Sequence, residues 1–144
     1  MKLFLPKLAT SSEIVEMDFL IDKRLPPQAT DPCQVHAVLK VHGKKEDYFR
    51  LDLSINGKLS IKCMRCMKTF DWLFDEAITV AVCDTEQKAE ALMSEYECMV
   101  SHNYHIEPVD VITDSLNLMA PEIHPDLSAC DLSDVKAYLS EYAE

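Results

Sequence analysis

The stretch FRLDLSINGKLSIKCMRCMKTFDWLFDEAITVAV, residues 49–82, decides the fold of this chain. Apolar residues alternate with polar ones along it in three runs, which are 49–55, 59–63 and 70–82. Such alternation is typical of strands with one buried face. Asn56-Gly57 predicts a hairpin between the first two runs. A three-residue loop with Gly57 in the left-handed bulge position keeps Leu53 opposite Leu59. The stretch therefore predicts three strands joined by tight turns.

The same alternation extends the predicted sheet toward the N-terminus. Runs 15–19 and 33–41 each alternate apolar with polar residues, and a proline-containing loop at 23–32 separates them. Gly43 is expected to end the second run and to begin a polar turn that closes at Asp47. Each of these two strands therefore has one buried face.

Helical signals dominate after residue 83. Asp84, followed three positions later by Gln87, forms a capping pattern that predicts a helix with Ala89, Leu92 and Met93 turned inward. The predicted elements of this half are a helix from Asp84 to about Ser94, a short strand at 97–100, a helix from Pro108 to Pro121 with an apolar stripe, and a last helix capped by Ser133. We expect a single α+β domain, 1–144, with an antiparallel sheet of about five to six strands in the N-terminal and central part and helices mainly in the C-terminal part.

Charge is distributed unevenly along the chain. The formal net charge is −11, from 14 Lys and Arg residues and 25 Asp and Glu residues. Residues 40–68 hold eight basic groups against three acids, whereas residues 69–144 hold two basic groups against seventeen acids. An acidic body repels a polyanion at long range, so direct RNA binding would use the basic segment. The acidic remainder suits a basic partner protein.

Composition excludes several classes of protein. No window approaches about 18 uninterrupted apolar residues, so no membrane span is expected, and the N-terminus is too weakly apolar for a signal peptide. The six cysteines are therefore expected to be thiols or metal ligands in a reducing cytoplasm. With only Gly43 and Gly57, the chain has no glycine-rich phosphate loop. No known catalytic spacing joins a serine or cysteine to a histidine and an acid, so we expect a cytoplasmic protein that is not an enzyme.

The segment Cys63-Met64-Arg65-Cys66 brings two sulfur ligands to one turn. A structural zinc site needs four such ligands, and the chain has no second Cys-x-x-Cys pair. Of the other candidates (Cys98, His102, His105, His124 and Cys130), His124 with Cys130 is the most attractive completion. The alternative is a reduced thiol pair that shapes the turn, with Cys63 packed as a small hydrophobe. A thioredoxin-like role is not favoured, because the pair joins two strands.

Two other polar pairs have simpler explanations than function. His102 and His105 lie in a polar loop, where histidines are usually solvated. Asp110 and Asp114 lie one helical turn apart, away from the apolar stripe, and are expected on a solvated face.

Three features of the sequence resemble the YceD family, the large ribosomal RNA subunit accumulation proteins of bacteria and plastids. They are the Cys-x-Arg-Cys turn, the aromatic strand after it, and the run Pro108-Val109-Asp110-Val111-Ile112-Thr113-Asp114 that closes on Leu118-Met119-Ala120-Pro121. The resemblance covers roughly residues 57–130, about half the chain. It implies a non-enzymatic role in the synthesis, processing or accumulation of 23S ribosomal RNA. It also implies a ribosomal RNA precursor or a basic large-subunit ribosomal protein as the partner.

Lys62, Arg65 and Lys68 surround the cysteine turn, and Phe70 and Trp72 follow closely. Basic and aromatic side chains together can bind RNA phosphates and stack on bases. Alternatively, the aromatic residues belong to the core, as their period-two spacing indicates, and the basic residues only make the turn soluble. We interpret the three basic residues as the candidate surface for RNA or for a protein partner.

Overall fold

A computed structural model describes residues 2–45 and 48–130 of the 144-residue chain. Its elements in chain order are β1 (Leu3–Phe4), α1 (Leu5–Ser11), β2 (Ile14–Ile21), β3 (Cys33–Lys45), β4 (Tyr48–Lys62), β5 (Thr69–Cys83), α2 (Glu86–Leu92), β6 (Glu97–Val100), β7 (His105–Ile106), α3 (Pro108–Met119) and a 3₁₀ turn (Leu127–Ala129). The predicted α+β class is confirmed, with a mostly antiparallel sheet and three α-helices in these ranges. The helix predicted from Ser133 lies outside the described residues.

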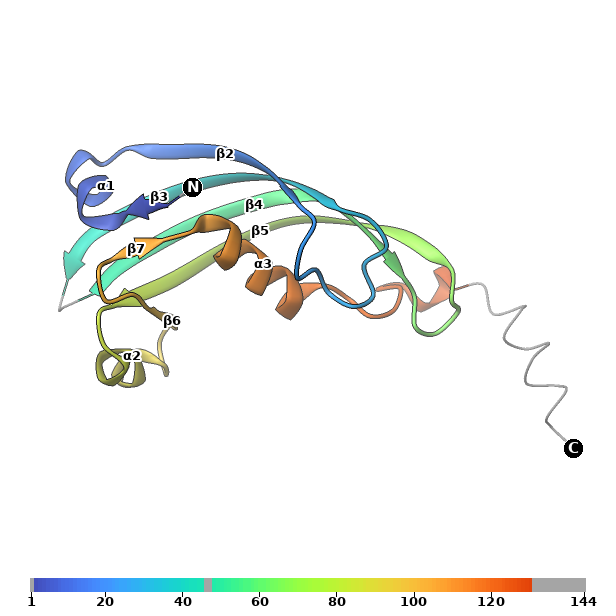
Figure 1. The fold of residues 1–144 in the computed structure, drawn as a ribbon. Coiled ribbons are helices and arrows are strands. Elements are labelled where there is room, and N and C mark those ends of the chain that lie inside the picture. Colours follow the sequence, from blue (N-terminus) through green and yellow to red (C-terminus); the bar gives the residue numbers. More distant parts are fainter. Residues whose placement is uncertain (1, 46–47, 131–144) are drawn as a thin grey trace, which may run out of the picture.

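The main sheet has five strands in the order β2-β3-β4-β5-β6. Strands β2 to β5 form an antiparallel meander in which each strand pairs with the next one along the chain. Strand β6 then pairs with β5 in parallel, because the crossover through α2 returns the chain in the same direction. The prediction of an antiparallel sheet is therefore wrong for this last strand. Figure 1 shows the long strands bowed over α3, with the short β1–β7 pair beside it.

Asn56 and Gly57 lie inside β4, so the hairpin predicted there is wrong. The apolar residues from Phe49 to Ile61, before and after Gly57, are all at odd positions, and they face the core along one continuous strand. Gly57 has no positive φ. A Cβ atom on Gly57 would lie 2.5 Å from the backbone oxygen of Gln34 and 2.8 Å from Cζ of Phe74. Glycine is needed here for the close approach of a neighbouring backbone and an aromatic ring.

The two ends of β4 test the predicted strand ends and connections. Strand β3 continues through Gly43 to Lys45, so the predicted end at Gly43 is also wrong. At the other end, residues 63–68 connect β4 to β5, as predicted. The register from Tyr48↔Cys83 to Lys62↔Thr69 places the cysteine turn at the tip of this strand pair.

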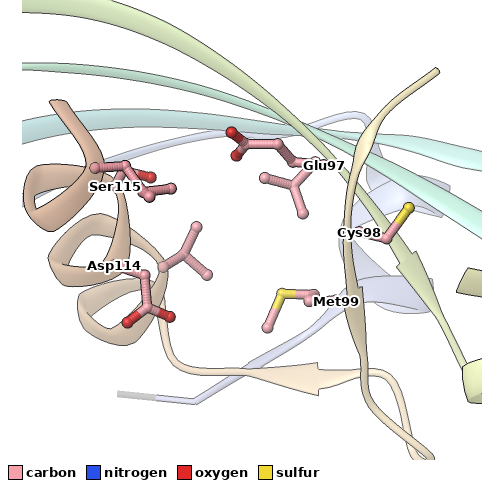
Figure 2. Close-up of a pocket in the computed structure, with 8 residues that line it drawn as sticks. Glu97, Cys98, Met99, Asp114 and Ser115 are labelled. Carbon is pink, nitrogen blue, oxygen red and sulfur yellow. The ribbon is translucent and has the colours of Figure 1, made fainter. Parts of the chain in front are cut away.

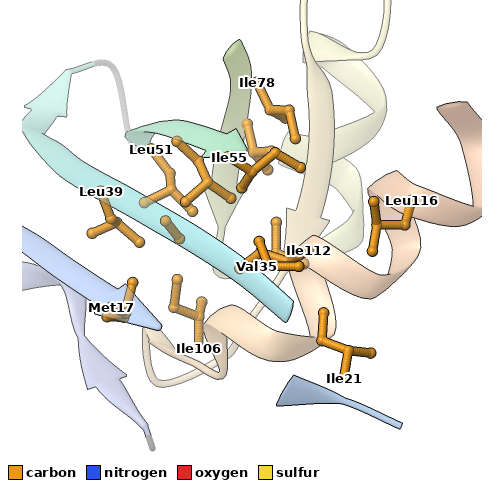
Figure 3. Packing of buried hydrophobic residues seen from close by; sticks show 14 of the residues in the cluster. Met17, Ile21, Val35, Leu39, Leu51, Ile55, Ile78, Ile106, Ile112 and Leu116 are labelled. Atoms are coloured by element: carbon orange, nitrogen blue, oxygen red, sulfur yellow. The ribbon is translucent and has the colours of Figure 1, made fainter. Parts of the chain in front are cut away.

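The core lies between the concave face of the sheet and α3. Figure 3 shows side chains from β2, β3, β4, β5, β7 and α3 converging there, among them Met17, Leu39, Ile55, Ile78, Ile106 and Ile112. The predicted apolar stripe consists of Val109, Ile112, Leu116 and Met119, and of these Ile112 and Leu116 are fully buried. Each such side chain contributes roughly 1.5–3 kcal/mol to the free energy of unfolding. Helix α3 therefore packs through the face that the sequence indicates.

Helix α2 begins one residue later than predicted. Thr85 is its N-cap, and the Thr85 side chain accepts a hydrogen bond from the backbone N–H of Lys88. Ala89 is buried as expected, but Met93 is 67% exposed because the helix ends at Leu92. None of the described helices is long and apolar enough to cross a membrane.

Substituting the two glycines by alanine should separate their roles. Gly57→Ala should lower the free energy of unfolding by about 1–3 kcal/mol, because the new methyl group meets the Gln34 carbonyl. Gly43→Ala should be neutral or stabilise the fold by up to about 1 kcal/mol, because nothing lies within 4 Å of a Cβ there. Urea unfolding of both variants measures the difference, and equal midpoints would contradict this account of Gly57.

Candidate metal centre

The turn between β4 and β5 holds Cys63 and Cys66 in the interior. The backbone N–H of Cys63 donates to the oxygen of Lys68 at 2.9 Å, and the N–H of Met67 donates to the oxygen of Cys63 at 2.8 Å. Met67 takes φ 66°, which closes the turn in the left-handed region. Both cysteines are buried, at 0% and 1% exposure. The turn therefore presents two sulfur atoms inward.

The segment after α3 supplies the other half of the centre. The N–H of Met64 donates to the oxygen of Glu122 at 2.8 Å, which joins this segment to the cysteine turn. The Gln28 side chain, from the loop between β2 and β3, donates to the oxygens of Ala120 at 3.4 Å and Pro121 at 3.2 Å. The N–H of Lys62 in turn donates to the oxygen of Gln28 at 2.9 Å. These hydrogen bonds hold residues 120–122, where the segment begins, beside the cysteine turn.

His124 and Cys130 converge on the two cysteines of the turn. The ligand atoms of Cys63, Cys66, His124 and Cys130 all lie within 4.8 Å of one another, close enough to hold a metal ion. Sγ of Cys63 is 3.7 Å from Sγ of Cys130. Nδ1 of His124 is 3.6 Å from Sγ of Cys66 and 3.2 Å from Sγ of Cys130. The predicted completion of the Cys-x-x-Cys pair is therefore the one that the structure brings together.

The electrostatics of the cluster stabilise the thiolate of Cys63 and oppose that of Cys130. Burial raises the pKa of the Cys63 thiol, but hydrogen bonds from the backbone of Cys66, His124 and Arg65 outweigh burial, and the pKa falls to about 5. Burial, together with the nearby sulfurs of Cys63 and Cys66, raises the pKa of Cys130 to about 11. Three thiolates at this spacing therefore need a compensating cation between them.

Phe70 supports the centre in a way that sequence reasoning missed. Its ring stacks on the imidazole of His124, with centroids 4.3 Å apart and planes 29° from parallel. Phe70 is the second residue of β5, immediately beyond the turn. Its alternation with Trp72 and Phe74 indicated only a core side chain, and a contact with a residue 54 positions later left no local signal.

The remaining candidate residues lie outside this cluster. His102 and His105 are exposed and make hydrogen bonds with backbone oxygens of Asp84 and Asn103. Asp110 and Asp114 are exposed as predicted, and both make ion pairs with Arg24, at 2.8 Å and 3.4 Å. Lys62, Arg65 and Lys68 are all exposed around the buried cysteines.

Comparisons with family models, with curated proteins and with solved structures find no match to this chain. Its function has to be inferred from its residues and their geometry.

Substitution by glycine should have opposite effects on the free energy of unfolding at the two methionines of the turn. Met67 is 51% exposed and has a positive φ, so Met67→Gly should raise the free energy of unfolding by up to about 1 kcal/mol. Met64 is 59% exposed with an ordinary backbone, so Met64→Gly should cost about 0.5–1 kcal/mol. Chemical unfolding of the two variants makes the comparison. A destabilised Met67→Gly variant would show that the turn does not depend on its left-handed residue.

Proposed function

We propose that Cys63, Cys66, His124 and Cys130 hold a structural zinc ion. The observation that carries this proposal is the spacing of the four ligand atoms. Tetrahedral zinc, with Zn–S near about 2.3 Å and Zn–N near about 2.05 Å, places two sulfurs about 3.8 Å apart and a sulfur and a nitrogen about 3.6 Å apart. The Cys63–Cys130 and Cys66–His124 distances of 3.7 Å and 3.6 Å agree with these values. The Cys130–His124 distance of 3.2 Å is shorter than the tetrahedral one, and all four ligand atoms lie within 4.8 Å of one another.

The donor set favours a structural ion over a catalytic one. Three cysteines and one histidine complete a tetrahedron and leave no position for water or substrate, which is the arrangement of structural zinc sites. Soft thiolate ligands also select zinc over magnesium or calcium. We therefore propose a binding module without enzyme activity, in which the four side chains join the β4–β5 turn to the segment after α3.

Metal content tests the centre directly. Protein purified without chelator should contain about one zinc ion per chain, and the Cys63→Ser, Cys66→Ser double variant should contain none and lose several kcal/mol of stability. Elemental analysis and thermal unfolding provide the two readouts. Cys98→Ser is the matched control, because Cys98 lies on β6 outside the cluster and its loss should not change metal content.

A second substitution keeps this test decisive if the double variant fails to fold. His124→Cys replaces one ligand by another in a four-cysteine set, and this variant should still bind one zinc ion. His124→Ala should not. Wild-type protein without stoichiometric metal would overturn the proposal and would leave the cysteines as a reduced pair that shapes the turn.

We further propose that this module acts in the cytoplasm as a factor for the accumulation of 23S ribosomal RNA and for biogenesis of the large ribosomal subunit. Support comes from the resemblance of the cysteine turn and of α3 to the YceD family. A second support is that Lys62, Arg65 and Lys68 are exposed around the centre, where they could contact a ribosomal RNA precursor. The acidic remainder of the chain suits a basic large-subunit ribosomal protein.

Reversing the charge of the basic turn tests this role in cells. In a strain that lacks the gene, mature 23S RNA should fall, and the wild-type protein should restore it. The Lys62→Glu, Arg65→Glu, Lys68→Glu variant should fold normally but fail to restore the RNA, because phosphate contacts are lost. A Lys2→Glu, Lys7→Glu, Lys23→Glu variant has the same net charge at exposed positions elsewhere and should restore it. An unchanged 23S level in the deletion strain would refute the role itself.

A further inference from the structure

The outer edge of β5 is paired over only part of its length. Strand β6 pairs with residues 80–83 of β5. Within the described part of the chain, residues 69–79 have β4 on one side and no strand on the other. A sheet edge of this kind presents unpaired backbone N–H and C=O groups. The open length exceeds that of an average strand, which is about 5–6 residues.

Two hollows flank this edge at Ala77, Ile78 and Thr79. One, of about 260 Å³, lies on the core face, where its other walls are Glu97, Ser115, Leu118 and Met119. The second, of about 440 Å³, lies on the opposite face, where its other walls include Arg50, Ser54 and Tyr96. Successive side chains of a strand point to opposite faces of a sheet. A strand added beside 77–79 would therefore place its side chains alternately in the two hollows.

The core-side hollow continues along α3. A neighbouring hollow of about 320 Å³ shares Glu97, Ser115 and Leu118 with it. Figure 2 shows Glu97 on β6 and Ser115 on α3 on opposite walls of this space. Leu118 is 76% exposed on the same side, and Leu73, on the opposite face of β5, is 75% exposed. The region combines apolar surface with acidic groups at its rim.

The acids of this edge favour a basic occupant. Asp75, Glu76 and Glu97 are exposed, and no ion pair joins any of them to a lysine or arginine within the described ranges. A second copy of the chain would bring like charges together across the new strand pair, which is destabilising. A strand with lysine or arginine on one face would instead pair with these carboxylates.

We propose that residues 73–79 of β5 bind an extended, basic segment of a partner protein by addition of a strand to the sheet. In this mode the backbone hydrogen bonds give affinity and the side-chain hollows give selectivity. Basic side chains on one face of the segment would extend along Leu118 and Met119 and pair with Glu76 and Glu97, because these four residues share the core face of the edge. The apolar side chains would alternate with them and lie in the hollow on the opposite face. The inference rests on the proposed function only for the class of partner, and it involves neither the four metal ligands nor the basic turn.

A designed peptide tests this edge on the purified full chain. The probe is a synthetic peptide of about ten residues in which lysine alternates with valine. It should bind at least about tenfold more tightly than a glutamate–valine peptide of the same length. Methylation of consecutive backbone nitrogens keeps every charge but removes the donors of a strand, and this peptide should not bind. Calorimetry gives the affinities, and amide chemical shifts identify the strand that is contacted.

Matched charge variants locate the contact. Asp75→Lys, Glu76→Lys, Glu97→Lys should weaken binding of the lysine–valine peptide by at least about tenfold. Glu13→Lys, Glu16→Lys, Glu90→Lys makes the same change of net charge at exposed positions outside residues 69–79 of β5 and should leave binding within about twofold.

Three results would overturn the proposal. They are equal affinity for the methylated peptide, which would indicate charge attraction alone; shifts on β2 instead of β5; and a wild-type dimer by light scattering whose interface is this edge. All are read from purified protein, so failure here leaves the 23S RNA prediction unaffected. Failure of that prediction likewise leaves the peptide result standing.

Discussion

The pairing register between β4 and β5 is the constraint on which the rest of the structure depends. It runs without a shift from Tyr48↔Cys83 to Lys62↔Thr69. A slip of one residue would turn the buried odd positions of β4 to the opposite face. The same register ends the pair at residues 63–68 and fixes the direction in which Cys63 and Cys66 point. Core and candidate metal centre are therefore consequences of one alignment.

The candidate metal centre joins parts of the chain that are far apart in sequence. Cys63 and Cys130 are 67 residues apart. By analogy with a disulfide that closes a loop of this length, a shared ion would restrict the unfolded chain by roughly 4 kcal/mol. The hydrogen bonds of Gln28 and Met64 hold the same segments without any ion. The ion would thus further stabilise an arrangement of these segments that the hydrogen bonds already hold.

Much of the fold could be predicted because its signals are local. Alternation identified β2 to β5, and Pro108 and Pro121 located α3. Asn56-Gly57 led to a wrong prediction of a hairpin. The turn preference of these two residues is weaker than the pairing of β4 with β5, which joins fifteen residue pairs. His124 and Cys130 could be predicted as ligands from their chemistry, because few other cysteines and histidines were available to complete the site. The stacking of Phe70 on His124, the parallel pairing of β6 and the open edge of β5 depend on where distant segments meet, and no short stretch of sequence records that.

The meander has a consequence for the order in which the chain can fold during synthesis. Strands β2 to β5 are neighbours both in sequence and in the sheet, so their contacts can form as soon as residue 83 has left the ribosome. The turn with Cys63 and Cys66 is then already shaped by its hairpin. His124 and Cys130 are the last of the four ligands to be synthesised, and the turn that holds the other two is formed before them. Closing the centre would thus be a late step of synthesis, and a chain that stops before Cys130 could not complete it.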